Sequence, residues 1–295
     1  MKENLIPNIT LNNGVKMPAL GFGTAMISDD EIPSVIGDAL KEGYRYFDCA
    51  PEYGNAGKIG AQLRAGDIPR EELFIATKLP APDHGYDKTL RAFDAACEDM
   101  GLDYFDLYVI HHPLLDYDAF CESWKAMEKI CKQGRARAIG LSGFLEVHLE
   151  RIFGMCEIPP QADMFECNPF FTITECRKYC AAKGIHVVNW FPLGGPAVRR
   201  HSFPREDNTR LLENETLIDI AKERGKTPAQ IALCWAVQKG MTPIPKSSKR
   251  ERMRENREIF DFVLSDVEMH RTDALNYDRR YGLDPMTFNG DYSKG

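Results

Sequence analysis

Short apolar runs alternate along the chain with longer amphipathic segments. Each run is rich in β-branched or aromatic residues and has the length of a buried β-strand. The segments between them, such as residues 29–43, 86–101 and 116–134, have the apolar spacing of helices, and several end in glycine, which commonly terminates a helix. We predict eight strands, over residues 19–23, 44–48, 73–78, 105–110, 136–141, 162–166, 186–190 and 241–244.

Alternating strands and helices predict an α/β protein with a parallel sheet. Eight such units in 295 residues fit a closed (β/α)8 barrel, the TIM barrel. A doubly wound open sheet is the alternative, but its G-x-G-x-x-G fingerprint is absent, because GFGTAM at residues 21–26 keeps only two of the glycines. The length also fits two domains of about 150 residues each. We expect residues 1–295 to form a single barrel domain.

Two segments lie outside the repeating pattern. Residues 8–18 predict an N-terminal β-hairpin, with Asn13 and Gly14 as a two-residue type I′ turn. Residues 276–295 form a polar and aromatic C-terminal tail with little periodicity.

Composition and charge narrow the class of protein. Apolar residues make up 43% and charged residues 27%, which excludes a disordered, collagenous or small disulfide-stapled chain. The net charge of −7 disfavours binding to nucleic acid or to anionic membranes, so an anionic ligand would need a local basic cluster. Nine cysteines without a C-x-x-C pair predict reduced thiols. With no apolar signal core in residues 1–10 and no run of 18 apolar residues, we expect a soluble, cytoplasmic protein.

Ionisable residues stand where the predicted strands end. Asp48 ends the second strand and Tyr53 lies in the loop after it, Lys78 ends the third strand, and His111 follows the fourth. Each one alone has an ordinary explanation, such as a helix cap, a solvated side chain or a packing contact. The C-terminal ends of barrel strands converge on one mouth, however, so we predict that these four side chains lie together.

These four residue types suit the polarisation and protonation of a carbonyl group. A tyrosine with an ordinary pKa of about 10 is a weak acid, but a neighbouring lysine ammonium favours the tyrosinate and makes the phenol a better proton donor. An aspartate paired with the lysine offsets the cost of burying the ammonium. A neutral histidine can donate a hydrogen bond to the carbonyl oxygen. None of these groups supplies electrons, so a hydride must come from a cofactor.

The segment after the last predicted strand is basic. IPKSSKRERMREN, residues 244–256, places hydroxyls and cations at the start of a helix, where free backbone N–H groups favour a phosphate. The alternatives are a nucleic-acid patch or a solvated helix face, the latter for Lys249, Arg250 and Arg254 in particular.

Four segments resemble the signature segments of the aldo-keto reductase family, in the family's order and spacing. They are GYRYFDCAPEYGN at residues 43–55, FIATKLP at 74–80, YFDLYVIHHP at 104–113, and the basic segment at 244–256. The tail sequence YGLDPMTF at 281–288 is similar to that of short-tailed microbial members called diketogluconate reductases.

The resemblance implies an NADP-dependent oxidoreductase that acts on a small-molecule carbonyl, as a monomer and without a metal site. In this reading Tyr53 is the general acid for reduction, Lys78 lowers its pKa, Asp48 pairs with Lys78, and His111 orients the carbonyl. The substrate contacts that the resemblance implies are Ala25, Tyr53, His111 and His112.

The resemblance also implies NADPH, in preference to NADH, as the cofactor. Lys246, Ser247 and Arg252 match positions that hold its 2′-phosphate, and Glu255 and Asn256 match adenine contacts. Trp190 stands where the family usually stacks a tyrosine on the nicotinamide. Further cofactor contacts are implied for Gly23, Thr24, Asp48, Ser142, Met164, Leu193 and Ser248.

Several positions depart from the family pattern. Ser142 is kept, but Gly143 and Met164 replace an asparagine and a glutamine that bind the nicotinamide carboxamide, and each lost hydrogen bond is worth about 1 kcal/mol. We therefore predict weaker or differently satisfied nicotinamide binding. Ala25, Pro80 and His112 replace aromatic residues and predict a wider, less apolar substrate pocket.

Two further segments have competing interpretations. Arg199, Arg200 and Arg205 either close over the cofactor pyrophosphate or attract an acidic substrate, or they belong to a mobile basic loop. In the tail, Tyr281, Met286 and Phe288 form either a pocket wall or a contact on the barrel exterior.

The favoured function is NADPH-dependent reduction of an aldehyde or ketone. The alternative is an NADP(H)-binding sensor or regulatory subunit with weak or no turnover. A phosphate-handling lyase or isomerase barrel does not explain Tyr53 and Lys78 together.

Overall fold

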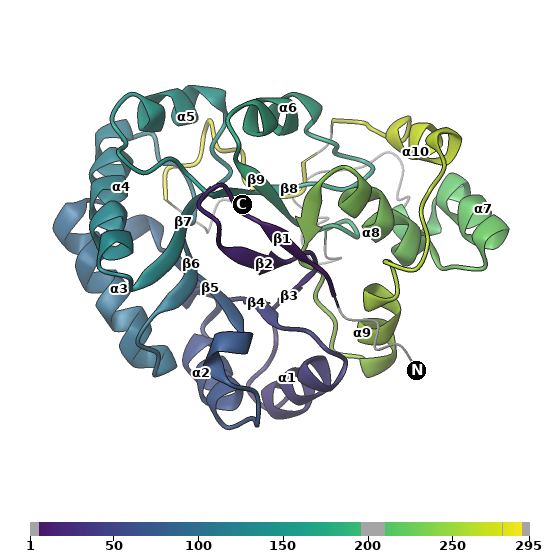
Figure 1. Ribbon diagram of the computed structural model, residues 1–295. Helices are drawn as coiled ribbons and strands as arrows, with labels where there is room; N and C mark the ends of the chain where they lie inside the picture. The colour runs from purple at the N-terminus through teal and green to yellow at the C-terminus, as the bar shows by residue number, and fades with distance from the viewer. Residues whose placement is uncertain (1–5, 196–209, 279, 291–295) are drawn as a thin grey trace.

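Eight parallel strands form the centre of the protein and follow one another in chain order around a nearly closed barrel (Figure 1). The computed structural model describes residues 6–195, 210–278 and 280–290. The Gly23 N–H donates to the Pro245 carbonyl at 3.2 Å and joins the first barrel strand to the segment after the last. The (β/α)8 prediction is therefore confirmed. The strands are β3 (Gly21–Gly23), β4 (Tyr46–Asp48), β5 (Phe74–Leu79), β6 (Phe105–Ile110), β7 (Ala136–Ser142), β8 (Ala162–Glu166), β9 (His186–Trp190) and β10 (Met241–Pro243).

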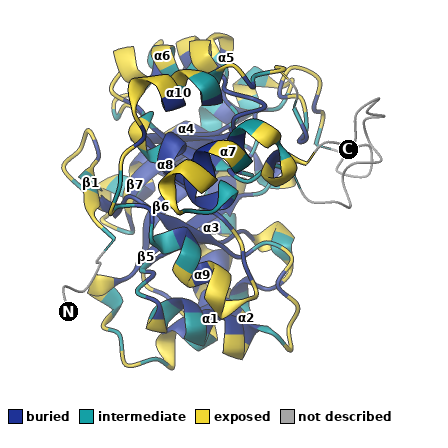
Figure 2. Ribbon diagram, turned by 90° about the vertical axis from the view of Figure 1, so that its right-hand side faces the viewer, coloured by how far each residue is buried: buried dark blue, intermediate teal, exposed yellow. Residues whose placement is uncertain are grey.

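Helices surround the barrel, and each buries part of its surface against the strands or against a neighbouring helix. Figure 2 shows the buried residues concentrated in the strands and the exposed residues on the outer faces of the helices. The helices are α1 (Ile32–Lys41), α2 (Ala56–Arg64), α3 (Tyr86–Met100), α4 (Tyr117–Lys132), α5 (Glu146–Phe153), α6 (Thr174–Ala182), α7 (Glu215–Arg224), α8 (Pro228–Gln238), α9 (Arg250–Arg257) and α10 (Asp266–Asp273). Short 3₁₀ turns in the connections include η1 (Pro51–Tyr53), η2 (Arg70–Glu72), η3 (Ala81–Asp83) and η5 (Leu211–Glu213).

Side chains alternate along each strand between an inner and an outer core, as the two-residue period of a strand requires. On β5, Phe74 and Ala76 belong to the inner core of the barrel, whereas Ile75 and Leu79 pack outward under the helices. Because both faces are covered, the strands are apolar runs, and this is why they could be recognised in the sequence.

The N-terminal hairpin covers the end of the barrel opposite the catalytic candidates. Its strands β1 (Asn8–Thr10) and β2 (Lys16–Pro18) pair antiparallel, which confirms the predicted hairpin. Figure 1 views this end of the barrel, with β1 and β2 across its centre. Leu11 and Met17 join the inner core and close it from below.

The predicted type I′ turn of the hairpin is wrong. Leu11 N–H donates to the Val15 carbonyl and Gly14 N–H donates to the Leu11 carbonyl, both at 2.9 Å, so the loop has three residues. Gly14 has a φ of +88°, but Asn13 is not among the described residues with positive φ, whereas a type I′ turn needs positive φ at both central positions. The Asn13 side chain instead donates to the Arg137 carbonyl at 3.0 Å and ties the hairpin to β7.

Within the described part of the chain, every helix is too short or too polar to cross a bilayer.

Candidate active site at the barrel mouth

Tyr53, Lys78 and Asp48 form a hydrogen-bonded group at the C-terminal ends of neighbouring strands. Asp48 ends β4, Tyr53 ends the η1 turn that follows, and Lys78 lies near the end of β5. The Lys78 Nζ lies 2.7 Å from the Asp48 Oδ2, 3.1 Å from the Tyr53 Oη and 2.9 Å from the Cys49 carbonyl. Lys78 and Asp48 are each 3% exposed. A buried lysine of this kind is stable only because its charge is paired.

His111 joins the group from the end of β6. Its backbone N–H donates to the Leu79 carbonyl at 3.2 Å, and its ring lies edge-on to the Tyr53 ring with centroids 6.1 Å apart. The His111 Nδ1 lies 3.1 Å from the Glu52 Oε2. The structure thus brings together the four predicted residues, and it adds Glu52, which the sequence interpretation missed. The available signal was its position directly before Tyr53, within the same short turn.

Burial and the neighbouring side chains together set the protonation states of these groups. Burial raises the pKa of Tyr53 to about 12, although the Lys78 ammonium acts in the opposite direction. Burial favours the neutral form of Lys78, but Asp48 and Tyr53 outweigh it and hold the pKa of Lys78 above its ordinary value. Burial lowers the pKa of His111, and Glu52 offsets part of this effect. At neutral pH the site therefore contains a phenol, a charged lysine and a neutral histidine.

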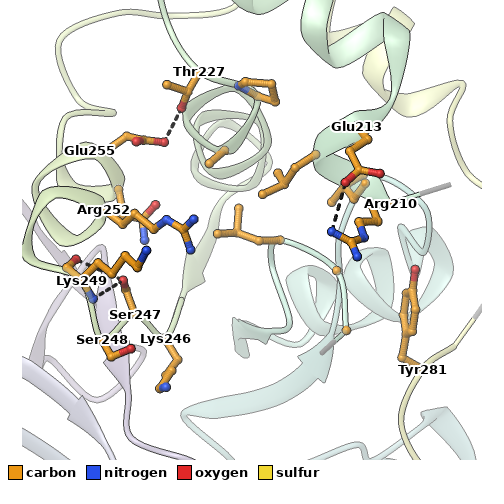
Figure 3. Close-up of a pocket in the computed structure, with 18 residues that line it drawn as sticks. Arg210, Glu213, Thr227, Lys246, Ser247, Ser248, Lys249, Arg252, Glu255 and Tyr281 are labelled. Carbon is orange, nitrogen blue, oxygen red and sulfur yellow. Dashed lines mark hydrogen bonds and ion pairs between the residues drawn. The ribbon is translucent and has the colours of Figure 1, made fainter. Parts of the chain in front are cut away.

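A cavity of about 720 Å³ lies beside β10 and is rimmed by the basic segment (Figure 3). Its lining includes Leu193, Lys246, Ser247, Ser248, Arg252, Glu255 and Asn256, which the resemblance assigned to the cofactor, together with Lys249, Arg210 and Tyr281. In Figure 3, Lys249 and Arg252 lie on the side opposite Arg210. A cavity of this size with cations and hydroxyls on its rim fits a phosphate-bearing small molecule.

The cations of the basic segment divide into two groups. Glu42, only 3% exposed, accepts hydrogen bonds from Arg250 at 2.7 Å and from Arg254 at 3.1 Å and 3.2 Å, and so holds α9 against the end of α1. Lys249 was grouped with these two as a solvated helix face, but it lines the cavity with Arg252. The division depends on Glu42, which is more than 200 positions away in the sequence.

The end of β3 connects the cavity with the hydrogen-bonded group. Gly23 pairs with Asp48 in the sheet, and the Thr24 hydroxyl donates to the Asp48 carbonyl at 2.8 Å. A Cβ placed on Gly23 would lie 3.7 Å from the Cβ of Lys246, a residue of the cavity lining. The Asp48 Oδ1 is buried and has no hydrogen-bond partner among the described residues. This acceptor fits a hydroxyl group of a ligand that extends from the cavity towards Lys78.

The ends of β7 and β8 bring apolar groups to the mouth. Ser142, on β7, is 3% exposed and lies beside Met164 of β8, which is fully buried in the inner core. Gly143 has a φ of +73°, and its N–H donates to the Met164 carbonyl at 2.8 Å. The side-chain amides of the family pattern are therefore replaced at these two positions by a backbone contact and a thioether.

The tail lies at the mouth. The buried Glu166 carboxylate accepts the backbone N–H groups of Tyr281 and Gly282, both at 2.7 Å, and a Cβ on Gly282 would collide with the Trp190 ring. Tyr281 lines the cavity.

Farther along the tail, the Phe288 ring lies 4.9 Å from the His112 ring, which stacks on His111 at 4.5 Å. Tyr281 and Phe288 thus form walls at the mouth, while Met286 is 45% exposed. Ala25 and Pro80 are partly exposed, after β3 and β5. Arg199, Arg200 and Arg205 lie outside the described residues.

Comparisons with known proteins place these features in a family. The family model named Aldo/keto reductase family matches residues 19–277. The chain is similar to morphine 6-dehydrogenase of Pseudomonas putida, with 40% identity over 95% of this chain and 94% of that protein. It is also similar to glyoxal reductase of Bacillus subtilis, with 40% identity over 97% and 98% of the two chains.

Solved structures agree with this relationship. A Bombyx mori aldo-keto reductase in complex with NADP superposes with a TM-score of 0.86 at 29% identity, over 97% of this chain and 98% of that one. An aldo-keto reductase from a deep-sea metagenome gives a TM-score of 0.86 at 34% identity, over 92% and 96% of the two chains.

Proposed function

Because the chain belongs to the aldo/keto reductase family, we propose that it is an NADPH-dependent oxidoreductase that reduces an aldehyde or ketone to an alcohol. Residues 1–295 would form one catalytic domain, working as a cytoplasmic monomer. The observation that carries the proposal is the buried contact of Lys78 with both Asp48 and Tyr53, beside His111. No simple structural need explains a buried lysine that contacts a tyrosine hydroxyl at the mouth of a barrel.

The proton chemistry follows from these contacts. When bound, the nicotinamide supplies a hydride to the carbonyl carbon. Tyr53 gives its phenolic proton to the carbonyl oxygen, and the Lys78 ammonium, 3.1 Å from the hydroxyl, stabilises the tyrosinate that remains. Asp48 keeps the ammonium charged and in place. In the reverse direction Tyr53 takes the proton of the alcohol.

The cavity provides the residues that would hold the cofactor. Lys246, Ser247 and Arg252 would bind the 2′-phosphate and favour NADPH over NADH, since NADH lacks this group. Glu255 and Asn256 would contact the adenine. The orphan Asp48 Oδ1 would accept a hydrogen bond from the cofactor on the side of the barrel mouth. The other proposed contacts are Gly23, Thr24, Ser142, Met164, Trp190, Leu193 and Ser248.

The substrate is proposed only as a small-molecule aldehyde or ketone that meets Ala25, Tyr53, His111 and His112. Two relatives of equal identity are named for morphine and for glyoxal, which are very different molecules. Their names therefore indicate a shared reaction type rather than a shared substrate.

The test follows NADPH absorbance with purified protein and a panel of aldehydes, ketones, keto-sugars and steroids. We expect turnover of at least one class, and we expect Tyr53→Phe to bind NADPH normally but to lose the activity. Tight NADPH binding without turnover of any class of compound would instead favour the NADP(H)-binding sensor. This alternative is based on Gly143 and Met164, which lack the side-chain amides of the family pattern.

A further inference from the structure

The start of α8 is hydrogen-bonded to α9 at one end of the cavity. Thr227, the residue before α8, donates from its hydroxyl to the Glu255 Oε1 at 2.6 Å, and both residues line the cavity (Figure 3). The Gln230 side-chain amide donates to the backbone carbonyls of Glu255 and Glu258 at 3.2 Å and 2.9 Å. The two helices are therefore fixed to each other at Glu255, through its backbone and through its carboxylate.

The Thr227 hydroxyl does more than cap its own helix. Its oxygen accepts the Gln230 backbone N–H at 3.2 Å, and the Thr227 N–H donates to the Gln230 Oε1 at 3.0 Å, which completes a capping box. The cap uses only the oxygen of the hydroxyl. A carboxylate can only accept, so the single hydroxyl proton is directed to Glu255. This donation is separate from the cap and serves the residue in the cavity.

Glu255 and Asn256 line the cavity with hydrogen-bonding groups that the protein itself does not use. The second carboxylate oxygen of Glu255 has no hydrogen-bond or ion-pair partner among the described residues. The Asn256 side chain is 4% exposed and also lacks a partner within the described ranges, although buried amides are normally hydrogen-bonded. Pro228 and Ala229 add apolar surface to the same lining. An acceptor, an amide and an apolar wall suit a heteroaromatic base that carries an amino group.

We propose that Thr227 is a positioning residue that acts through Glu255 and makes the cavity select an amino-substituted base over its oxo analogue. By holding Oε1, the Thr227 hydroxyl restricts the rotation of the carboxylate and leaves Oε2 as the acceptor for the amino group. An oxo group at that place would set its lone pairs against those of Oε2. The inference rests on the proposed function, in which Glu255 and Asn256 contact the adenine, and it adds a residue of another helix that determines base specificity.

The test compares NADPH with its hypoxanthine analogue, deamino-NADPH, in which an oxo group replaces the amino group of adenine. Calorimetry of the full-length protein gives the dissociation constant of each dinucleotide, and their ratio measures base selection. We expect the wild type to bind NADPH about tenfold or more tightly than deamino-NADPH, because Oε2 meets a donor in one and an acceptor in the other. A wild-type ratio near one overturns the proposal.

Thr227→Asp separates the positioning of Glu255 from the capping of α8. Aspartate caps helices at least as well as threonine, but it cannot donate to Glu255 and its charge repels the carboxylate. The added charge weakens both dinucleotides alike through their phosphates, so the ratio is the measure, and we expect it to fall to about threefold or less. The uncharged Thr227→Val should lower the ratio similarly, whereas Thr227→Ser, which keeps the donor, should retain it. A wild-type ratio in Thr227→Asp contradicts the inference.

Ser265→Ala is the matched control for the loss of a helix cap. Ser265 caps α10 with a capping box of the same kind, and it is not among the described residues that line the cavity. This substitution should lower the unfolding midpoint and leave the ratio unchanged. In a Glu255→Ala background the ratio should be near one, and Thr227→Asp should not change it further, because Thr227 acts through Glu255. A changed ratio in Ser265→Ala, or a further change in the double variant, contradicts the proposal.

The same measurements separate this inference from the proposed function. Binding of both dinucleotides without reduction of any carbonyl compound contradicts the reductase activity alone, and the ratio still decides the role of Thr227. Absence of binding of either dinucleotide contradicts the proposed function and the inference together.

Discussion

The buried ionisable side chains on the two sides of the barrel have different contacts. At the ends of β4, β5 and β6, the ionisable side chains contact one another, with Lys78 bound to both Asp48 and Tyr53. On β8, by contrast, the acidic side chains bind backbone N–H groups: Glu166, at the end of the strand, binds the tail, and Asp163, near its start, accepts the Phe144 N–H at 3.4 Å. Buried charges that pair with one another and face the mouth indicate chemistry, whereas buried carboxyl groups that accept hydrogen bonds from backbone N–H groups indicate scaffolding.

The largest effect is expected from a substitution at Lys78, which contacts both Asp48 and Tyr53. Lys78→Met leaves the buried Asp48 without its cation and Tyr53 without its neighbour, so we expect carbonyl reduction to fall about 10³-fold and stability to fall by about 3 kcal/mol. Steady-state kinetics and urea unfolding measure the two effects. Adding Asp48→Asn should recover part of the stability but none of the activity. Recovery of activity in the double variant would show that the pair is only structural.

The second prediction compares two arginines of α9, one that lines the cavity and one that binds Glu42. Arg252→Ala removes a cation from the cavity rim, and loss of a charge-assisted bond should raise KM for NADPH by about 10- to 100-fold while leaving KM for NADH nearly unchanged. Arg250→Ala, which removes only a contact with Glu42, is the matched control and should change KM for NADPH much less. Similar effects of the two substitutions on NADPH would contradict the division of the basic segment.

The third effect concerns the pH dependence of stability that Asp163 of β8 causes. Asp163 is fully buried, its Oδ2 has no hydrogen-bond partner within the described ranges, and burial raises its pKa well above the ordinary value. Its ionisation in the folded state is therefore unfavourable, and stability is lost as the pH rises above the pKa of the unfolded chain. Asp163→Asn should raise the unfolding midpoint at pH 7 and change it little at pH 4. An equal change at both pH values would rule out the titration of Asp163 as the cause.

The smallest effect is expected at Gly143, where the family pattern has an asparagine that binds the nicotinamide carboxamide. Gly143 has positive φ, which asparagine tolerates, and the atoms nearest to a Cβ added there are 3.9 Å and 4.0 Å away. Gly143→Asn should therefore fit and supply one hydrogen bond of about 1 kcal/mol, or about fivefold tighter NADP(H) binding by calorimetry. Gly143→Ala carries the backbone strain without the amide and should not tighten binding. A wild-type dissociation constant already below the micromolar range would count against the prediction of weakened binding.

Local patterns predicted most of the barrel and the catalytic half of the mouth. The strands were visible because both of their faces are buried, and Asp48, Tyr53 and Lys78 follow from strand ends that a barrel must bring together. The missed features depend on contacts that are distant in sequence or on the direction of a single side chain. The anchoring of Gly282 by Glu166 joins positions 116 residues apart, and the inward turn of Glu52 could not be distinguished from a solvated carboxylate.

The central claim is that this mouth transfers hydride from NADPH to a carbonyl carbon with Tyr53 as proton donor. The most direct measurement is single-turnover reduction of an aldehyde with NADPH deuterated at the nicotinamide C4, followed by mass spectrometry of the alcohol. We predict one deuterium on the carbinol carbon with the wild-type protein and a rate about 10²- to 10⁴-fold lower with Tyr53→Phe. An alcohol without deuterium, or an equal rate for Tyr53→Phe, would contradict the claim.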